Sequence, residues 1–185
     1  MDRPGALAEL RAALTRFVGA HDVGDTWCVA LSGGADSLAL TAVAAAMRPT
    51  TALIVDHRVQ PGSDEVAQTA RAAAVALGCV DAAVIGVDVG TAGGPEAAAR
   101  TARYRALDRA RAGAPVLLGH TLDDQAETVL LGLGRGSGAR SIAGMRPHDP
   151  PWCRPLLGVR RAVTRAACAE AGLTPWHDPH NTDPR

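Results

Sequence analysis

The chain has 185 residues, which fits one ordinary domain with a real core, and we expect a single domain over residues 1–185. Arginine supplies all 19 basic residues and 19 acidic residues balance them, which excludes a protein that holds nucleic acid by a large net positive charge. The four cysteines are scattered without a CxxC pair, and no apolar run approaches the ~20 residues of a membrane span, which predicts a cytoplasmic protein with no membrane segment.

The predicted elements alternate between helix and strand along the chain. The first segment repeats apolar residues at three- and four-residue spacing and predicts an amphipathic helix; its apolar positions are Leu7, Leu10, Leu14, Phe17 and Val18. Short apolar runs typical of buried strands follow, each with a helical segment after it. The predicted strands are 27–31, 53–56, 83–87 and 116–118, and the later helices are 37–47, 63–77, 95–111, 123–133 and 159–171. This alternation predicts an α/β fold, with a doubly wound, Rossmann-like parallel sheet and helices on both faces.

The loop after the first predicted strand reads SGGADS, from Ser32 to Ser37. Its glycines let backbone amides approach an anion, and a helix that begins there stabilises negative charge at its N-terminus. The loop therefore predicts a phosphate site, although a tight turn in which Asp36 only complements the helix dipole is the structural alternative. The Walker phosphate loop requires a lysine, and since this chain contains none, a Walker-type NTPase is excluded.

SGGADS resembles the SGGxDS signature of the PP-loop ATP pyrophosphatases, which cleave ATP between its α and β phosphates and transfer AMP. Three longer stretches are similar to the lysidine synthetase family of that superfamily: VDHRVQPGSDEVA at 55–67, EAAARTARYRAL at 96–107 and GHTLDDQAETVLLGLGRGSGARSIAGM at 119–145. WHDPHNTD at 176–183 resembles the family's DPSNxD segment. The sequence departs from the family at Arg58, where glycine is usual, and at 140–141.

The resemblance implies a fold of the adenine nucleotide alpha hydrolase type, with ATP and Mg²⁺ as cofactors. In the family's reaction the wobble cytidine of tRNA(Ile) with a CAU anticodon attacks the α-phosphorus of ATP through its O2, and pyrophosphate leaves. The ε-amine of L-lysine then displaces AMP from C2 and gives lysidine. Family members carry further C-terminal tRNA-binding domains, so we expect these 185 residues to be the catalytic domain. Whether the chain forms a homodimer stays open.

The resemblance also implies roles for particular side chains. The implied catalytic residues are Asp36, Asp124, Glu127 and Arg100, of which Asp36 and Asp124 would hold Mg²⁺. Asp124 and Glu127, three residues apart on one helix face, would receive the lysine ammonium and help to remove its proton. Arg100 and Arg103 would bind ATP phosphates or the lysine carboxylate. The nucleotide site would contain Ser32, Gly33, Gly34, Ala35, Asp36, Ser37, Asp56, His57, Arg103 and His120.

Structural alternatives remain open for several of these residues. Thr121 and Asp124 fit a helix capping box, the two arginines fit a solvated helix face, and His120 fits a structural hydrogen-bond donor. Two other functions are also considered. A 2-thiocytidine-type tRNA sulfur transferase would need a CxxC pair, which is absent. A non-catalytic adenine-nucleotide sensor would leave the second acidic pair without a purpose.

Overall fold

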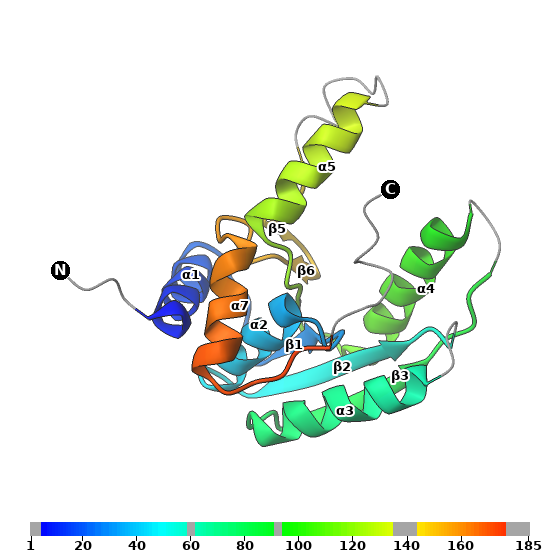
Figure 1. The fold of residues 1–185 in the computed structure, drawn as a ribbon, viewed down its shortest axis with the longest axis horizontal. Coiled ribbons are helices and arrows are strands. Elements are labelled where there is room, and N and C mark those ends of the chain that lie inside the picture. The colour runs from blue at the N-terminus through cyan, green and yellow to red at the C-terminus, as the bar shows by residue number, and fades with distance from the viewer. Residues whose placement is uncertain (1–4, 59–61, 91–93, 135–143, 177–185) are drawn as a thin grey trace.

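The computed structural model describes residues 5–58, 62–90, 94–134 and 144–176 (Figure 1). Within them, six strands form one sheet in the order β3-β2-β1-β4-β6-β5. The strands are β1 (Trp27–Ala30), β2 (Thr50–Asp56), β3 (Asp81–Gly86), β4 (Val116–Leu117), β5 (His148–Asp149) and β6 (Trp152–Cys153). The predicted parallel sheet is confirmed from β3 to β6. It differs at the edge, where β5 pairs antiparallel with β6.

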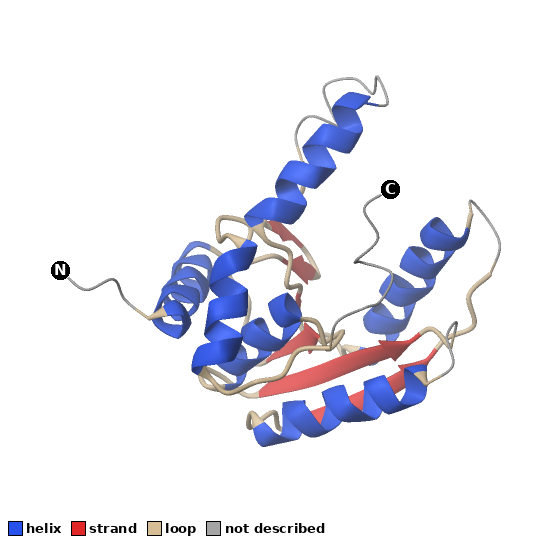
Figure 2. Cartoon of the chain, in the orientation of Figure 1, coloured by secondary structure: helices blue, strands red, loops and turns tan. Residues whose placement is uncertain are grey.

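Helices cover both faces of the sheet, as predicted (Figure 2). They are α1 (Ala6–Ala20), α2 (Ala35–Ala45), α3 (Ser63–Ala76), α4 (Pro95–Ala110), α5 (Leu122–Gly134) and α7 (Arg161–Glu170). Successive strand residues point to opposite faces, so neighbours in one strand enter different cores. In β1, Val29 joins the larger core with α1, α2, α3 and α7, whereas Cys28 joins the smaller core under α4.

Helix α5 projects away from the sheet (Figure 1) and buries none of its residues against the described parts of the chain. Leu130 and Leu131 are 66% and 58% exposed. Among the described residues, no helix has the length and apolar character needed to cross a membrane. Parts of two stretches that resemble the lysidine synthetase family lie outside the described residues: 135–143 of the stretch at 119–145, and 177–183 of the stretch at 176–183.

The strand order places two polar loops side by side. The chain leaves β1 for β2 and β3 on one side and returns to β4 on the other, so the order reverses between β1 and β4. Ligands of open α/β sheets bind at such a point. Gly119 follows β4, and a Cβ atom there would come within 2.9–3.0 Å of backbone atoms of Asp36 and Ser37. The glycine thus permits the loop after β4 to contact the start of α2.

Candidate active site

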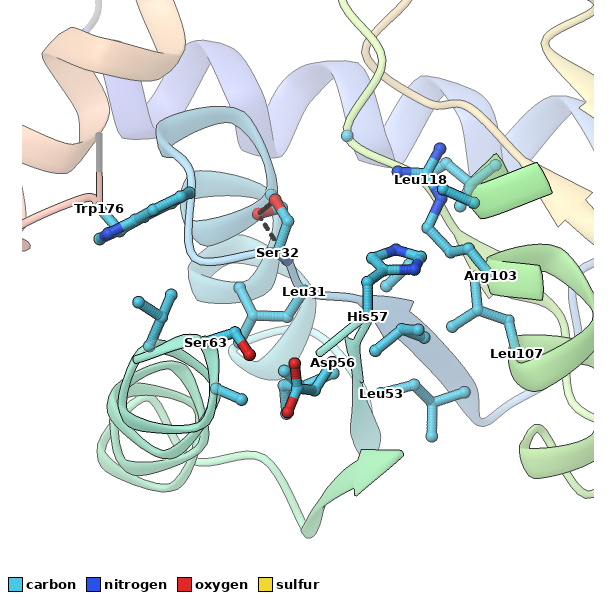
Figure 3. A pocket seen from close by; sticks show the side chains of 18 of the residues that line it. Leu31, Ser32, Leu53, Asp56, His57, Ser63, Arg103, Leu107, Leu118 and Trp176 are labelled. Carbon is cyan, nitrogen blue, oxygen red and sulfur yellow. Dashed lines mark hydrogen bonds between the residues drawn. The ribbon is translucent and has the colours of Figure 1, made fainter. Parts of the chain in front are cut away.

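A cavity of about 810 Å³ opens at the carboxyl ends of β1, β2 and β4. Its size suits a small-molecule ligand, and its walls include Leu53, Leu107 and Leu118 (Figure 3). Most of the predicted site residues line it: Ser32, Asp36, Ser37, Asp56, His57, Arg103, His120 and Asp124. Arg100 and Glu127 are not among the lining residues. The structure therefore brings the predicted phosphate loop (residues 32–37) and Asp124, near the start of α5, to one cavity.

The SGGADS loop forms a tight turn between β1 and α2. Gly33 has a φ of 85°, a left-handed conformation that favours glycine. Ser37 ties the turn together, because its hydroxyl donates to the Gly34 carbonyl (3.0 Å) and accepts the Ser32 N–H (3.2 Å). Gly34 is the N-cap of α2, and no side chain caps the helix, so the first N–H groups of α2 lack a side-chain acceptor. Gly33, Gly34 and Ala35 shape this turn without lining the cavity.

Trp176 also lines the cavity and was not among the predicted site residues. Its backbone N–H donates to the Gly33 carbonyl at 3.0 Å, which brings the end of the described chain against the turn. Figure 3 shows its indole on one side of the cavity, across from Arg103. The sequence offered one indication of a role for Trp176: it is the first residue of the WHDPHNTD stretch that resembles the lysidine synthetase family.

Asp36 lies at the start of α2 and contacts α7. Burial raises the pKa of its carboxyl group, and the negative charge of Asp124 adds to this effect. The Thr164 hydroxyl donates to Asp36 Oδ1, and Arg161 Nε lies 3.6 Å from Oδ2; both favour the charged form. The Asp36 carboxyl group is therefore held in place by α7, a contact that no sequence motif had indicated.

Asp124 lines the cavity and also caps the start of α5. Its Oδ2 accepts from the N–H (2.7 Å) and the hydroxyl (2.8 Å) of Thr121, which confirms the predicted capping interaction at the start of α5. Its Oδ1 accepts from Arg161 Nη2 at 2.6 Å. Burial opposes ionisation, but these hydrogen bonds and the Arg161 charge outweigh it and lower the pKa of Asp124. Asp124 is consequently ionised at neutral pH.

Arg161 connects the predicted carboxylates, although no sequence motif pointed to it. Besides Asp36 and Asp124, its guanidinium reaches Glu127, with Nη1 3.4 Å from Oε1. Its backbone N–H donates to Asp123 Oδ2 at 2.8 Å, so Asp123 accepts at the start of α7. The sequence placed a helix here but gave no reason to choose Arg161 among nineteen arginines.

The two predicted arginines of α4 differ in position. Their guanidinium carbons lie over the Tyr104 ring, 5.1 Å from its centroid for Arg100 and 5.7 Å for Arg103. Only Arg103 lines the cavity, and burial lowers its pKa. Figure 3 shows the Arg103 side chain near His57. Arg103 is thus better placed than Arg100 to contact a ligand in this cavity.

The two cavity histidines are neutral at physiological pH. Burial lowers the pKa of His120 to about 4, with the Arg154 charge adding to the effect. Burial and the Arg103 charge also lower the pKa of His57. The Nδ1 atoms of both rings are buried and have no hydrogen-bond partner among the described residues. Each ring can therefore exchange a hydrogen bond with a ligand without bringing a positive charge.

No group of three or more His, Cys, Asp or Glu side chains suited to a metal occurs in the described parts of the chain. Asp36 and Asp124 both line the cavity and share Arg161 as an ion-pair partner. Such a pair fits Mg²⁺, which is commonly held by one or two carboxylates together with substrate phosphates and water. It does not fit a closed all-protein metal cage.

Curated relatives match the whole chain. The tRNA(Ile)-lysidine synthase of Mycolicibacterium paratuberculosis is 74% identical over 186 residues, covering 100% of this chain and 58% of the relative. The tRNA(Ile)-lysidine synthase of Mycobacterium leprae is 68% identical over 190 residues, with coverage of 100% and 58%. That of Rhodococcus jostii is 66% identical over 180 residues, with coverage of 97% and 55%. The chain thus spans little more than half the length of these relatives.

Solved structures share the fold at low identity. A U34-tRNA thiolase from Methanococcus maripaludis has a TM-score of 0.77 and 17% identity, covering 97% of this chain and 68% of that one. An NMN synthetase from Francisella tularensis has a TM-score of 0.57 and 14% identity, covering 91% and 70%. At these identities the likeness concerns the fold alone. The model of the PP-loop domain family matches residues 7–185, and the chain therefore belongs to that family.

Proposed function

We propose that this chain is the catalytic domain of an enzyme that forms lysidine in tRNA(Ile), using ATP and L-lysine. One observation carries the proposal: the predicted phosphate loop after β1 and the loop after β4, which leads to Asp124, meet at one cavity. The names of relatives at 63–74% identity support the same reaction. Because ATP, tRNA and lysine are present in the cytoplasm, the enzyme would act there.

The turn at the start of α2 would seat the phosphates of ATP. Its uncapped N–H groups and the helix dipole favour an anion, and Ser32 adds a hydroxyl donor. The apolar wall of Leu53, Leu107 and Leu118 would cover the adenosine. Arg103, which lines the same cavity, would add charge-assisted hydrogen bonds to a phosphate. A lysine is therefore not required for phosphate binding here.

Asp36 and Asp124 would hold Mg²⁺ against these phosphates. When bound, the ion would stabilise the negative charge that develops as pyrophosphate leaves. Asp124 suits this role because its lowered pKa keeps it ionised, while its second oxygen is fixed by Thr121. Asp36 is held from the other side by Thr164. The two carboxylates are thus oriented before any ligand arrives.

The acidic face of α5 would receive lysine. Asp124 and Glu127 can both accept hydrogen bonds from an ammonium group, as they do from Arg161. Attack on C2 of the adenylated cytidine needs a neutral amine, so one proton must leave the ammonium group first. Glu127 is exposed and can pass that proton to solvent. The amine then forms the C–N bond, and AMP departs with the electrons of the broken C–O bond.

Incorporation of labelled lysine into tRNA(Ile) with ATP and Mg²⁺ tests the proposal. For the protein that carries this domain, we expect Asp36→Ala and Glu127→Ala each to reduce incorporation by at least about 100-fold. Asp64→Ala, which changes an exposed acid on α3, serves as the matched control and should retain activity. Incorporation of sulfur in place of lysine would instead indicate a sulfur transferase. No pyrophosphate release with tRNA and lysine present would indicate a nucleotide sensor.

A further inference from the structure

The Arg161 guanidinium occupies the centre of the acidic site. Each of its three nitrogens faces a different carboxylate: Nη2 is 2.6 Å from Asp124, Nη1 is 3.4 Å from Glu127 and Nε is 3.6 Å from Asp36. The acids come from two elements, α2 and α5, and the cation comes from a third, α7. One side chain thus offsets part of the negative charge of three carboxylates, across the point where the strand order reverses.

These oxygen atoms are the ones that the proposed reaction needs for other cations. Asp124 Oδ1, for example, already accepts from Arg161 and would have to release it to coordinate Mg²⁺ fully or to receive an ammonium group. Removing one partner from a partly buried ion cluster leaves the remaining like charges uncompensated, which is unfavourable. A cation near these carboxylates therefore stabilises the folded chain.

The backbone around Arg161 permits an exchange of cations without unfolding the helix. Its N–H is held separately by Asp123, and its neighbour Thr164 on α7 is held by Asp36. The Arg161 side chain is 31% exposed, so its end can turn toward solvent by a change of rotamer. The start of α7 can stay in place while the guanidinium leaves.

We propose that Arg161 is the resident counter-cation of this site, a positioning residue that orients Asp36, Asp124 and Glu127 and gives them up when Mg²⁺ or lysine binds. The assignment of Mg²⁺ and lysine as the displacing cations rests on the proposed function. Mg²⁺ and lysine would thus compete with the Arg161 guanidinium for the same carboxylates. Either cation binds only if its interaction with these oxygens is more favourable than that of the guanidinium.

Thermal unfolding of the chain, measured without ATP and tRNA, tests the role of Arg161 independently of whether the enzyme turns over. Arg161→Met keeps an unbranched apolar side chain and removes the charge. Arg165→Met changes the next arginine of α7, which is exposed, forms no ion pair among the described residues and acts on the Asp36 carboxyl less strongly than Arg161 does. In low salt, we expect Arg161→Met to lower Tm by about 4–10 °C and Arg165→Met to change it by less than about 2 °C.

The decisive measurement is the response to cations. Adding about 10 mM Mg²⁺ or L-lysine should raise Tm of Arg161→Met by several degrees, increasing with the logarithm of concentration. The unsubstituted chain and Arg165→Met should respond by about 1 °C or less, and NaCl at equal ionic strength should not reproduce the rescue. If Arg161 were only a packing residue, Tm would fall without this specific rescue, and the inference would be overturned.

Arg161→Lys keeps the comparison available if the methionine variant does not fold. A lysine ammonium is a point charge that cannot present three separate nitrogens to three carboxylates. We expect its Tm and its response to Mg²⁺ to lie between those of the unsubstituted chain and Arg161→Met. A response to Mg²⁺ as large as that of Arg161→Met would contradict a role for the positive charge at this position, whereas failure of lysine incorporation alone would contradict only the reaction.

Discussion

At the scale of single residues, Arg58 combines an unfavourable backbone with a close packing contact. Its φ is 53°, a left-handed conformation that costs a non-glycine residue about 1 kcal/mol. Its guanidinium lies against Gly86, where a Cβ would come within 2.3–2.8 Å of three guanidinium atoms. The glycine that is usual in the lysidine synthetase family would relieve the backbone but lose that contact.

We therefore expect Arg58→Gly to raise the free energy of unfolding by about 0.5–1 kcal/mol, measured by urea denaturation. Ala112 has a φ of 49° and lies outside the cavity, so Ala112→Gly provides a control with the same backbone relief. A stabilised Ala112→Gly beside a destabilised Arg58→Gly would mean that the Arg58 side chain contributes more than its backbone costs.

The neutral His120 predicts a pH dependence of stability. Its pKa of about 4 in the folded chain lies below the 6.5 of an unperturbed histidine, so between these values the unfolded chain binds the extra proton. Its contribution is complete above pH 6.5 and is lost as the pH falls toward 4. We expect His120→Gln to reduce the loss of unfolding free energy between pH 7.5 and 5 by about 1–2 kcal/mol. Equal pH profiles for both chains would contradict a neutral, buried His120.

At the scale of elements, the approach of the β4–α5 loop to α2 depends on Gly119. A Cβ at this position meets backbone atoms of Asp36 and Ser37, which cannot move aside as a flexible side chain would. We expect Gly119→Ala to lower the unfolding free energy by about 1–3 kcal/mol and to weaken ATP binding in a calorimetric titration. Gly158→Ala has no heavy atom within 4 Å of the added Cβ and should leave ATP affinity unchanged. ATP binding unaffected by Gly119→Ala would show that the two loops need not touch.

Local pattern explains which elements the sequence could predict. Strand β2 and helix α3 carry long apolar periods, and the polar loops after β1 and β4 follow from the strand positions. Strands β5 and β6 have two residues each, too few for any period, and they form by pairing: β6 pairs with β4, and β5 pairs with β6. The role of Arg161 likewise depends on tertiary contacts between α7 and two earlier helices. The sequence could predict the carboxylates but not the cation between them.

At the scale of the whole molecule, charge limits what this chain can do with RNA. Its 19 basic and 19 acidic residues cancel, and several arginines already serve the protein itself. Arg161 faces three carboxylates, Arg111 pairs with Asp108, and Arg154 is buried and donates to the Arg146 carbonyl. While they hold these partners, the three side chains do not neutralise phosphates. ATP, by contrast, needs only one helix N-terminus and a few donors.

Binding of labelled tRNA(Ile), measured by fluorescence anisotropy at 50 and 200 mM salt, tests this limit. Each phosphate neutralised by a protein cation releases counterions, so a protein with six to ten such contacts loses about 10³–10⁵-fold in affinity over this range. For the 185-residue chain we expect weak binding and a loss of about 10-fold or less, together with measurable ATP·Mg²⁺ binding. Tight binding with a steep salt dependence would mean that local arginine clusters act despite the zero net charge. A neutral chain that makes few phosphate contacts releases few counterions, so its tRNA affinity should be low at both salt concentrations and should change little between them.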